Sequence, residues 1–197
     1  TRDCIKNHRS FEGGGARYNW SVLSYQGVSN LIDSVTAIKK CVFDDGSITK
    51  SQLVNALSNN FMRYEDVQML LKNTPKYGND LVKSDNIGCE IVKYAWELLR
   101  SFETKRGGRV LPSVILFVTY EQAGNEVGAT PDGRNEFTVL TDSVGATQGQ
   151  DRNGPTALLN SVLRLPLDIA VGTPVLNLRF HQKLMNQLDH YFEIRFL

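Results

Sequence analysis

Apolar side chains recur at helical spacing through the first half of the chain. Leu31, Val35, Ile38 and Val42 follow one another at intervals of four, three and four residues, so they would share one face of a helix. The polar run Asp-Asp-Gly at 44–46 is a turn signal and predicts the end of that helix. The pattern therefore indicates an amphipathic helix that turns these apolar side chains toward a core.

A second helix has its own start signal. Thr49-Lys50-Ser51-Gln52 has the form of a capping box, in which the threonine hydroxyl and the glutamine side chain each satisfy a free backbone N–H group. We expect a helix to begin here, with an apolar face made by Leu53, Leu57 and Phe61.

Two further helices are expected before the middle of the chain. A short one passes through Val67 and Leu70-Leu71 and stops before Pro75, because proline disfavours helix in the residue that precedes it. Asp85 is expected to cap the next helix, which continues to the polar, flexible segment 105–108. The side chains predicted to face the core from that helix are Ile87, Ile91, Ala95, Leu98 and Phe102.

From Val110 onward the pattern is that of strands and loops. The continuous apolar run 114–118 and the segment 175–180 are predicted strands, whereas 124–154 is rich in glycine and nearly free of helix signals. Loops of that length inside a compact domain are usually functional. Residues 157–163 are expected to form a short helix, and 184–192 has helical spacing.

The order of these elements bounds the fold class. Helices fill 29–104, and strands and loops fill 109–180, which favours α+β or a slice of an α/β fold. No internal repeat is visible. We expect residues 1–197 to form one domain or part of one, and the missing initiator methionine suggests that the chain was cut from something longer.

Composition removes several classes of function. The 197 residues carry a formal net charge of +1, so no long-range field attracts nucleic acid or an anionic membrane. The run 114–118 is far too short to span a membrane. Three widely spaced cysteines form neither a disulfide framework nor a CxxC pair, which predicts a reducing cytoplasm. His8, His181 and His190 lack the spacing of metal ligands, so no metal site is expected.

Two glycine-containing loops are conspicuous. The first, Gly13–Trp20, is either a tight loop whose aromatic side chains plug the core or part of a pocket lining. The second, Gly128–Arg134, has glycines in the outline of a P-loop, but it lacks the lysine and hydroxyl residue that follow in that motif, and Pro131 removes a backbone N–H. A Pro-Asp-Gly turn that presents Arg134 to a carboxylate or similar anion is the better interpretation; alternatively, Arg134 only ties loops together.

A third polar loop, 148–156, ends at Pro155, which suits the first position of a helix. Taken with the other two loops it completes a set of ordered segments that resembles a known family. The segments are GGARYNW (14–20), DSVTAIKKCVF (33–43), PKYGND (75–80), GATPDGR (128–134) and DRNGPTALLNSV (151–162). In this order and at this spacing they resemble the glycyl radical enzymes of the pyruvate formate-lyase-like branch.

The resemblance implies a fold and a chemistry. The fold would be α/β: part of a ten-stranded barrel, here one half-barrel with surrounding helices, incomplete in this chain. Family members use a thiyl-forming cysteine in one loop and a radical glycine in another, and neither segment is present. Cys4 resembles a non-catalytic cysteine, Cys41 lies in a predicted helix, and Cys89 shares only a Gly-Cys pair with the catalytic loop and also lies in a helical pattern.

The resemblance also implies a site and its partners. Segment 118–125, with Tyr120, and the turn that holds Thr130, Asp132 and Arg134 resemble the loop pair that shapes the substrate pocket. No catalytic residue is carried over. The chain departs from the family at 135–138 and at Gly145-Ala146, where substrate class is set.

The expected function is therefore that of a fragment of a glycyl radical lyase or dehydratase, which cleaves a C–C, C–N or C–O bond of a small polar or anionic substrate. It would bind no cofactor itself. Its glycyl radical would be installed by an activating enzyme that uses S-adenosylmethionine and an iron-sulfur cluster, and the full-length enzyme is expected to be a homodimer. The alternative is a non-catalytic remnant or scaffold derived from that family. On either hypothesis this chain alone is inactive.

Overall fold

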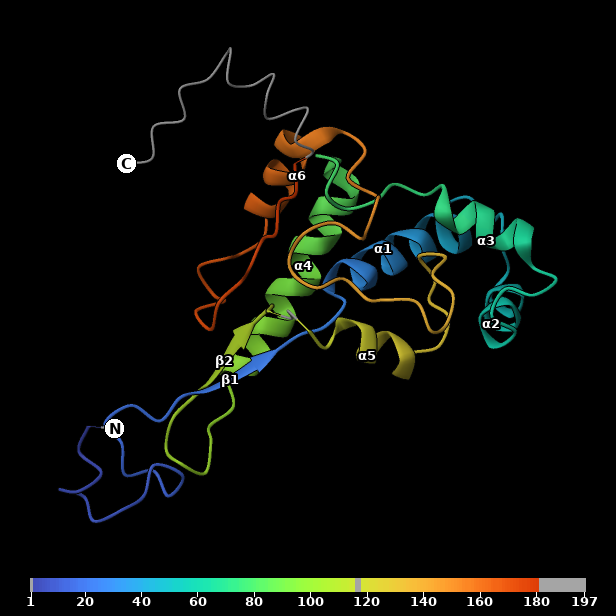
Figure 1. The fold of residues 1–197 in the computed structure, drawn as a ribbon. Coiled ribbons are helices and arrows are strands. Elements are labelled where there is room, and N and C mark those ends of the chain that lie inside the picture. Colours follow the sequence, from blue (N-terminus) through green and yellow to red (C-terminus); the bar gives the residue numbers. More distant parts are fainter. Residues whose placement is uncertain (1, 116–117, 181–197) are drawn as a thin grey trace.

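The computed structural model describes residues 2–115 and 118–180, and these form an elongated helical body with a small sheet near one end (Figure 1). Strand β1 (Ser21–Ser24) pairs in parallel with β2 (Val110–Ser113), so that Ser21 lies opposite Val110. Between the two strands come α1 (Val28–Ile38), the π-helical turn η1 (Lys39–Asp44), α2 (Lys50–Ser58), α3 (Glu65–Lys72) and α4 (Val82–Arg100); α5 (Tyr120–Glu126) and α6 (Gly154–Leu163) follow β2.

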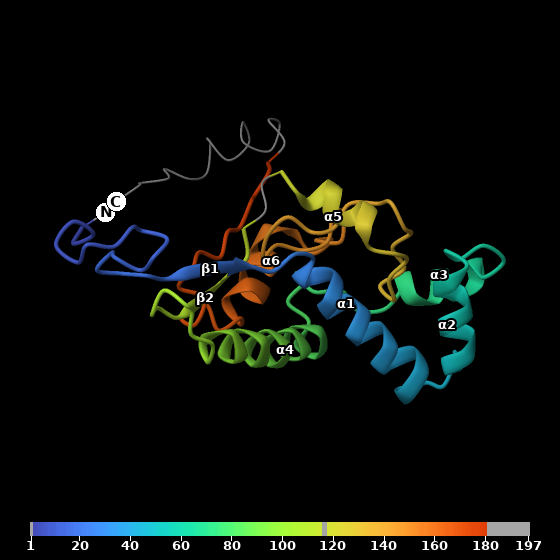
Figure 2. The same ribbon diagram turned by 90° about the horizontal axis from the view of Figure 1, so that it is seen from below.

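Helices α1 and α4 pack against each other and form the centre of the body, whereas α2 and α3 lie at the end away from the sheet (Figure 2). The larger core lies among α1, α4, α6 and the segments that follow β2. Its fully or nearly buried members are Val28, Ile32, Tyr77, Val92, Trp96, Val114, Val144, Leu158, Val162, Leu165, Ile169 and Ala170. A second core joins the end of α1 to η1, α2 and α3 through Ala37, Cys41, Ile48, Leu53, Ala56, Phe61, Val67 and Leu71.

The structure confirms three of the predicted helix-end signals, each of which acts locally. The Thr49 hydroxyl accepts a hydrogen bond from the backbone N–H of Gln52, and the Gln52 side chain accepts one from the N–H of Thr49, which completes the capping box of α2. Helix α3 ends at Lys72, before Pro75, and α6 begins with Pro155 in its first turn.

The predicted faces of the two long helices are partly wrong. On α1 the side chain of Leu31 is 50% exposed, whereas Asn30, Asp33 and Ser34 are buried. On α4 the buried side chains are Ser84, Asp85, Gly88, Val92 and Trp96, while the predicted Leu98 and, beyond the helix, Phe102 are exposed. Polar loops pack against both helices, so buried polar side chains of the helices find partners there. A prediction based on the spacing of apolar residues cannot detect such partners.

Asp85 is not the cap that the sequence predicts. Helix α4 begins at Val82 with Leu81 at its N-cap position, so Asp85 lies inside the first turns. Its carboxylate is fully buried and accepts a hydrogen bond from the Ser161 hydroxyl of α6. The residue therefore joins two helices instead of starting one.

The strands also differ from the prediction. Strand β2 covers Val110–Ser113, ahead of the expected run, and Val114 makes one further bridge to Pro174. Residues 175–180 form no regular strand, although the Val175 N–H donates to the carbonyl of Val114. Strand β1 had no sequence signal because it holds only four residues. The result is a mixed α/β fold with few strands.

The loop regions are confirmed with one exception. Residues 127–153 contain no helix, but α5 crosses the predicted start of that helix-free stretch. The aromatic residues of the first glycine loop do not plug the core, because Tyr18 and Trp20 are exposed and pack on each other.

The predicted helix at 184–192 lies outside the described residues. No helix within the two described ranges is long and apolar enough to cross a membrane.

Candidate functional site

A polar pocket of about 410 Å³ opens between the start of α5 and the loop that precedes α6. Tyr120 is the first residue of α5 and lies on its wall. The other lining residues are Glu121, Val139, Asp142, Ser143, Gly145, Ala146, Thr147, Gln148, Gly149, Asp151, Leu158, Asn177 and Arg179. Such a volume falls in the range of pockets that bind small molecules.

The pocket lining carries charged groups of both signs. Glu121, Asp142 and Asp151 contribute carboxylates, and Arg179 contributes a guanidinium group. The Asn177 amide donates a hydrogen bond of 2.9 Å to the Asp142 carboxylate, which fixes that carboxylate against the wall. Amides, hydroxyls and carboxylates at these positions can bind the hydroxyl groups of a small polar molecule.

Arg134, predicted to bind substrate, is buried and ties loops together. Its Nη1 donates to the carbonyl of Thr138 at 2.6 Å and to that of Gly124 at 3.5 Å, and its Nη2 donates to the carbonyls of Val127 and Gly128. Its Nε donates to the Thr130 hydroxyl. Each guanidinium N–H thus has an acceptor from the surrounding loop, so a ligand would have to compete with these bonds.

The turn that carries Thr130 and Asp132 is held from inside. The Asp132 carboxylate accepts hydrogen bonds from the Thr130 hydroxyl and from the Arg134 N–H, and its other oxygen accepts one of 2.8 Å from the Asn30 amide of α1. Gly133 adopts a φ of +92°, a conformation that favours glycine. The turn therefore has one rigid conformation, anchored on α1.

The structure separates the four predicted substrate-binding residues. Tyr120 lines the large pocket, whereas Asp132 and Arg134 line a neighbouring recess of about 250 Å³. The two cavities share Val139, Thr147 and Gln148. Direct contact of these residues with a substrate stays a prediction.

A buried polar network beneath these cavities brings the sequence segments together. Asp33 of α1 accepts hydrogen bonds from the Tyr77 N–H at 2.8 Å and from the Thr147 hydroxyl at 3.1 Å. Lys76 donates to the carbonyls of Leu71 and Asp132, each at 3.0 Å. Residues from DSVTAIKKCVF, PKYGND and GATPDGR thus hold one another in place.

Burial dominates the electrostatics of this network. It raises the pKa of the Asp33 carboxyl to about 7, and the nearby Lys76 ammonium opposes that rise. Burial likewise lowers the pKa of Lys76, against the attraction of Asp33 and Asp132. Burying these two ionisable groups costs free energy, and their hydrogen bonds with neutral groups compensate part of that cost.

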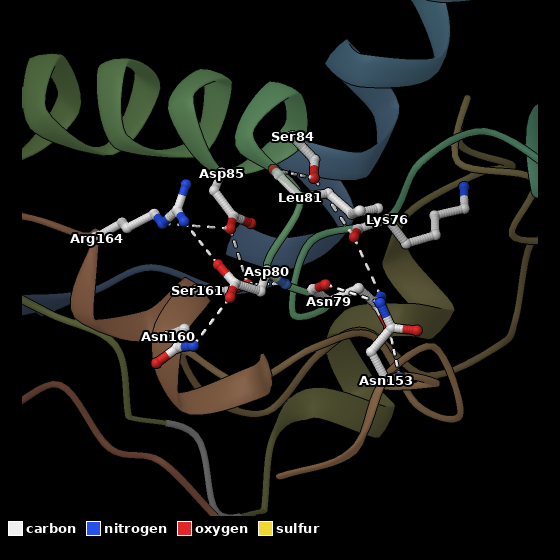
Figure 3. Close-up of polar contacts among 10 residues, drawn as sticks. All are labelled: Lys76, Asn79, Asp80, Leu81, Ser84, Asp85, Asn153, Asn160, Ser161 and Arg164. Carbon is white, nitrogen blue, oxygen red and sulfur yellow. Dashed lines mark hydrogen bonds and ion pairs between the residues drawn. The ribbon is translucent and has the colours of Figure 1, made fainter. Parts of the chain in front are cut away.

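A second network joins the loop after α3 to α6 (Figure 3). The Arg164 guanidinium lies 2.6 Å from the Asp80 carboxylate and 3.8 Å from that of Asp85. Ser161 donates its hydroxyl proton to Asp85 and accepts the Asp80 N–H. Because burial raises the pKa of Asp85, the donors supplied by Ser161 and Arg164 offset part of its desolvation.

The amide side chains of the same loops interlock. Asn79 donates to the carbonyls of Lys76 and Gln150, and its oxygen accepts the N–H of Asn153 at 3.0 Å. The Asn153 amide in turn donates to the carbonyl of Asn79 at 2.9 Å. These bonds fix the approach to α6 against the loop that follows α3 (Figure 3).

No role was predicted from the sequence for Asn30, Asp33, Lys76 and Asn79. The available signal was the set of polar residues inside or beside apolar helix patterns, since buried polar groups need specific partners. The long-range partners could not be read from the sequence, because they lie 44 to 114 positions away.

None of the three cysteines occupies a position suited to radical chemistry. Cys4 lies in the N-terminal loop, Cys41 is buried in η1, and Cys89 is in the middle of α4. Burial raises the pKa of the Cys41 thiol. These residues do not fit a thiyl site, so no step of such chemistry is assigned to this chain. Among the residues in the described ranges, no group of His, Cys, Asp and Glu is arranged to hold a metal ion.

The described residues form a mixed α/β fold with few strands and a pocket beside the start of α5. Residues 1–124 match the family described as pyruvate formate lyase-like. The chain belongs to that family, which confirms the resemblance based on the five segments.

Relatives found by sequence and solved structures support the same family assignment. The chain is 38% identical over 160 residues to isethionate sulfite-lyase of Bilophila wadsworthia, a match to 81% of this chain and 19% of the relative. It is 35% identical over 179 residues to trans-4-hydroxy-L-proline dehydratase of Clostridioides difficile. It superposes with a TM-score of 0.84 and 39% identity on the B12-independent glycerol dehydratase of Clostridium butyricum, with glycerol bound, over 88% of this chain and 22% of that one.

A structure of hydroxyproline dehydratase from Clostridioides difficile with its substrate bound also superposes, with a TM-score of 0.85 and 32% identity over 96% of this chain and 25% of that one. The chain spans roughly a fifth to a quarter of the length of these relatives.

Proposed function

We propose that this chain is part of a glycyl radical lyase or dehydratase that acts on a small polar substrate. The observation that carries the proposal is the superposition on two dehydratases solved with glycerol and with trans-4-hydroxy-L-proline bound, at 39% and 32% identity. The reaction would begin with hydrogen abstraction by a thiyl radical and end with cleavage of a C–O, C–C or C–N bond. The thiyl and glycyl residues would come from chain beyond these 197 residues.

The contribution of this chain is the wall of the substrate pocket. We place Tyr120, Asp142 and Asn177 at the substrate, because they line the large pocket and carry groups that bind hydroxyls. The turn at Thr130, Asp132 and Arg134 completes the wall. Arg134 holds it in shape through the loop carbonyls, and a grip on an anionic substrate group would require it to exchange some of those partners.

The wider assignment follows from the family. The complete enzyme would form a homodimer in the cytoplasm of an anaerobic cell, with the remaining strands of a ten-stranded barrel around the site. A separate activating enzyme, which uses S-adenosylmethionine and an iron-sulfur cluster, would install the glycyl radical. This chain by itself would be inactive.

The test is anaerobic activation of the complete gene product with such an activating enzyme, followed by electron paramagnetic resonance and a substrate panel. Glycerol, 1,2-propanediol, trans-4-hydroxy-L-proline and isethionate cover the chemistries of the relatives and solved structures. We expect a glycyl radical signal and turnover of one panel member or a close analogue. Absence of any radical signal would favour the alternative, a non-catalytic remnant or scaffold. A radical signal from the 197-residue chain alone would contradict the assignment of this piece.

A further inference from the structure

A second pocket of about 400 Å³ lies between the end of α3 and the loop that enters α6. It shares no lining residue with the pocket that holds Tyr120, but it shares Lys72, Lys76, Gln150 and Arg152 with the recess lined by Asp132 and Arg134. Its lining residues are Lys40, Lys72, Asn73, Thr74, Pro75, Lys76, Asn79, Leu81, Gln150, Arg152 and Asn153.

The charge of this lining is of one sign. It contains four cationic side chains and no carboxylate. Lys40 is already paired, since its ammonium lies 2.8 Å from the Asp45 carboxylate. The side chains of Lys72 and Arg152 make no hydrogen bond or ion pair with any residue in 2–115 or 118–180. In a chain of net charge +1, this is a local concentration of positive charge.

Lys76 adds a cation that is almost out of reach of water. It is 7% exposed, and its ammonium donates hydrogen bonds to two backbone carbonyls. Since an ammonium has three N–H groups, one further hydrogen bond can be made to a ligand. No carboxylate in the described part of the chain lies within the 4.0 Å of an ion pair. Asp33 and Asp132, the acidic groups nearest to it on the side of the neighbouring recess, are held by neutral donors from Tyr77, Thr147 and Asn30. A buried cation without a direct counterion is costly.

Part of the pocket wall is held in place without a ligand, whereas the side chains of Lys72 and Arg152 are exposed. A Cβ atom on Gly133 would lie 2.5 Å from Cγ of Lys72, so the stem of this lysine lies directly across the glycine. Asn79 and Asn153 hold each other by reciprocal hydrogen bonds, and Lys76 lies beside them (Figure 3). The part of the wall around Lys76, Asn79 and Asn153 is thus ordered in advance, so a ligand would have to order only the ends of the Lys72 and Arg152 side chains.

We propose that this pocket binds a multiply charged oxyanion of the phosphate class, held by Lys72, Lys76 and Arg152. Arginine and lysine are the side chains suited to phosphate oxygens, the first by two parallel hydrogen bonds and the second as a point charge. A volume of about 400 Å³ exceeds the needs of a bare phosphate ion, so the pocket suits a phosphate ester of a small organic molecule or a diphosphate.

The experiment is calorimetric titration of the protein as its gene encodes it, in a phosphate-free buffer, with three probes: inorganic phosphate, inorganic pyrophosphate and glycerol 3-phosphate. The test variant is Lys72→Gln with Arg152→Gln. Its matched control is Lys93→Gln with Lys105→Gln, which removes the same charge from exposed positions outside the pocket. Circular dichroism confirms that both variants fold. Lys72→Arg with Arg152→Lys keeps the charge.

We expect saturable binding of pyrophosphate or glycerol 3-phosphate that weakens by roughly tenfold or more in the test variant and weakens with added salt. The control and the charge-keeping variant should retain binding. Tighter binding of glycerol 3-phosphate than of inorganic phosphate would identify an organic phosphate as the ligand class. Absence of saturable binding by all three probes, or equal loss in the test and control variants, would overturn the proposal. The readout does not depend on enzymatic activity.

Discussion

The buried carboxyl of Asp33 makes the stability of the folded protein depend on pH. Its pKa of about 7 lies above the ordinary value of 3.8, so the folded protein binds a proton that the unfolded chain releases. Its contribution to the free energy of unfolding is therefore most favourable at low pH and is lost progressively as the pH rises from about 4 to about 7.

The corresponding variant is Asp33→Asn, which keeps an acceptor for the Tyr77 N–H and cannot ionise. We expect the fall in the free energy of unfolding between pH 4.5 and pH 7.5 to be about 3 kcal/mol smaller in the variant than in the wild type. Urea denaturation of both proteins across this range measures it. Parallel pH profiles for the two proteins would show that Asp33 has the same pKa in both states.

Arg134 provides a second test at the residue scale. Replacing it with alanine leaves several buried loop carbonyls without donors, and we expect a loss of about 3 kcal/mol in the free energy of unfolding. Arg134→Lys should recover less than half, because one ammonium cannot reach all of these acceptors.

Arg100→Ala, at an exposed position at the end of α4, is the control and should change stability by less than about 0.5 kcal/mol. In the complete enzyme, we expect Arg134→Ala also to reduce turnover several-fold. Reduced turnover with unchanged stability would instead indicate direct contact with the substrate.

At the scale of elements, the close contact of α1 with α4 is set by Gly88. A Cβ atom at this position would lie 3.0 Å from Cδ1 of Ile32, so the helices approach more closely than an alanine would allow without a shift. The position is in the interior of α4, where glycine otherwise costs about 1 kcal/mol relative to alanine.

We expect Gly88→Ala to destabilise the protein by about 1 kcal/mol, because overpacking outweighs the gain in helix propensity. Ile32→Val removes the atom nearest to the new methyl group. In that background the same change should become neutral or stabilising, with a coupling of about 1 kcal/mol in a double-mutant cycle measured by urea denaturation. Additive effects of the two changes would contradict the contact.

At the scale of the whole molecule, no described segment fully covers either face of β1. Val22 and Leu23 are 58% and 45% exposed, and neighbouring residues of a strand point to opposite faces of its sheet. A two-stranded sheet with apolar side chains exposed on both faces is marginal in water and favours association. In a larger α/β protein these faces would be covered by the rest of the chain.

We therefore expect the 197-residue chain to self-associate and to melt gradually. Val22→Lys with Leu23→Lys should reduce association in sedimentation velocity experiments, whereas Val54→Lys, at an exposed position on α2, should not. A monomer with a sharp, cooperative thermal transition would favour the alternative of a stand-alone remnant or scaffold.

The sequence by itself determined the features whose causes are local. The capping box at Thr49, the stop before Pro75 and the start of α6 at Pro155 each depend on residues within a few positions of one another, and the five ordered segments were enough to identify the family. Backbone hydrogen bonds at helix ends need no distant partner, so these predictions were confirmed.

Only the tertiary structure decided what the polar residues do. Asn30 meets Asp132 across 102 positions, Asp85 meets Ser161 across 76, and the face that α1 buries follows from such partners instead of from its apolar period. Two roles were predicted for Arg134, a grip on an anion or a tie between loops, and in the structure the carbonyls of its own loop take up its donors. The physical reason is that a buried polar group must be satisfied, and which group satisfies it depends on how distant segments of the chain come together.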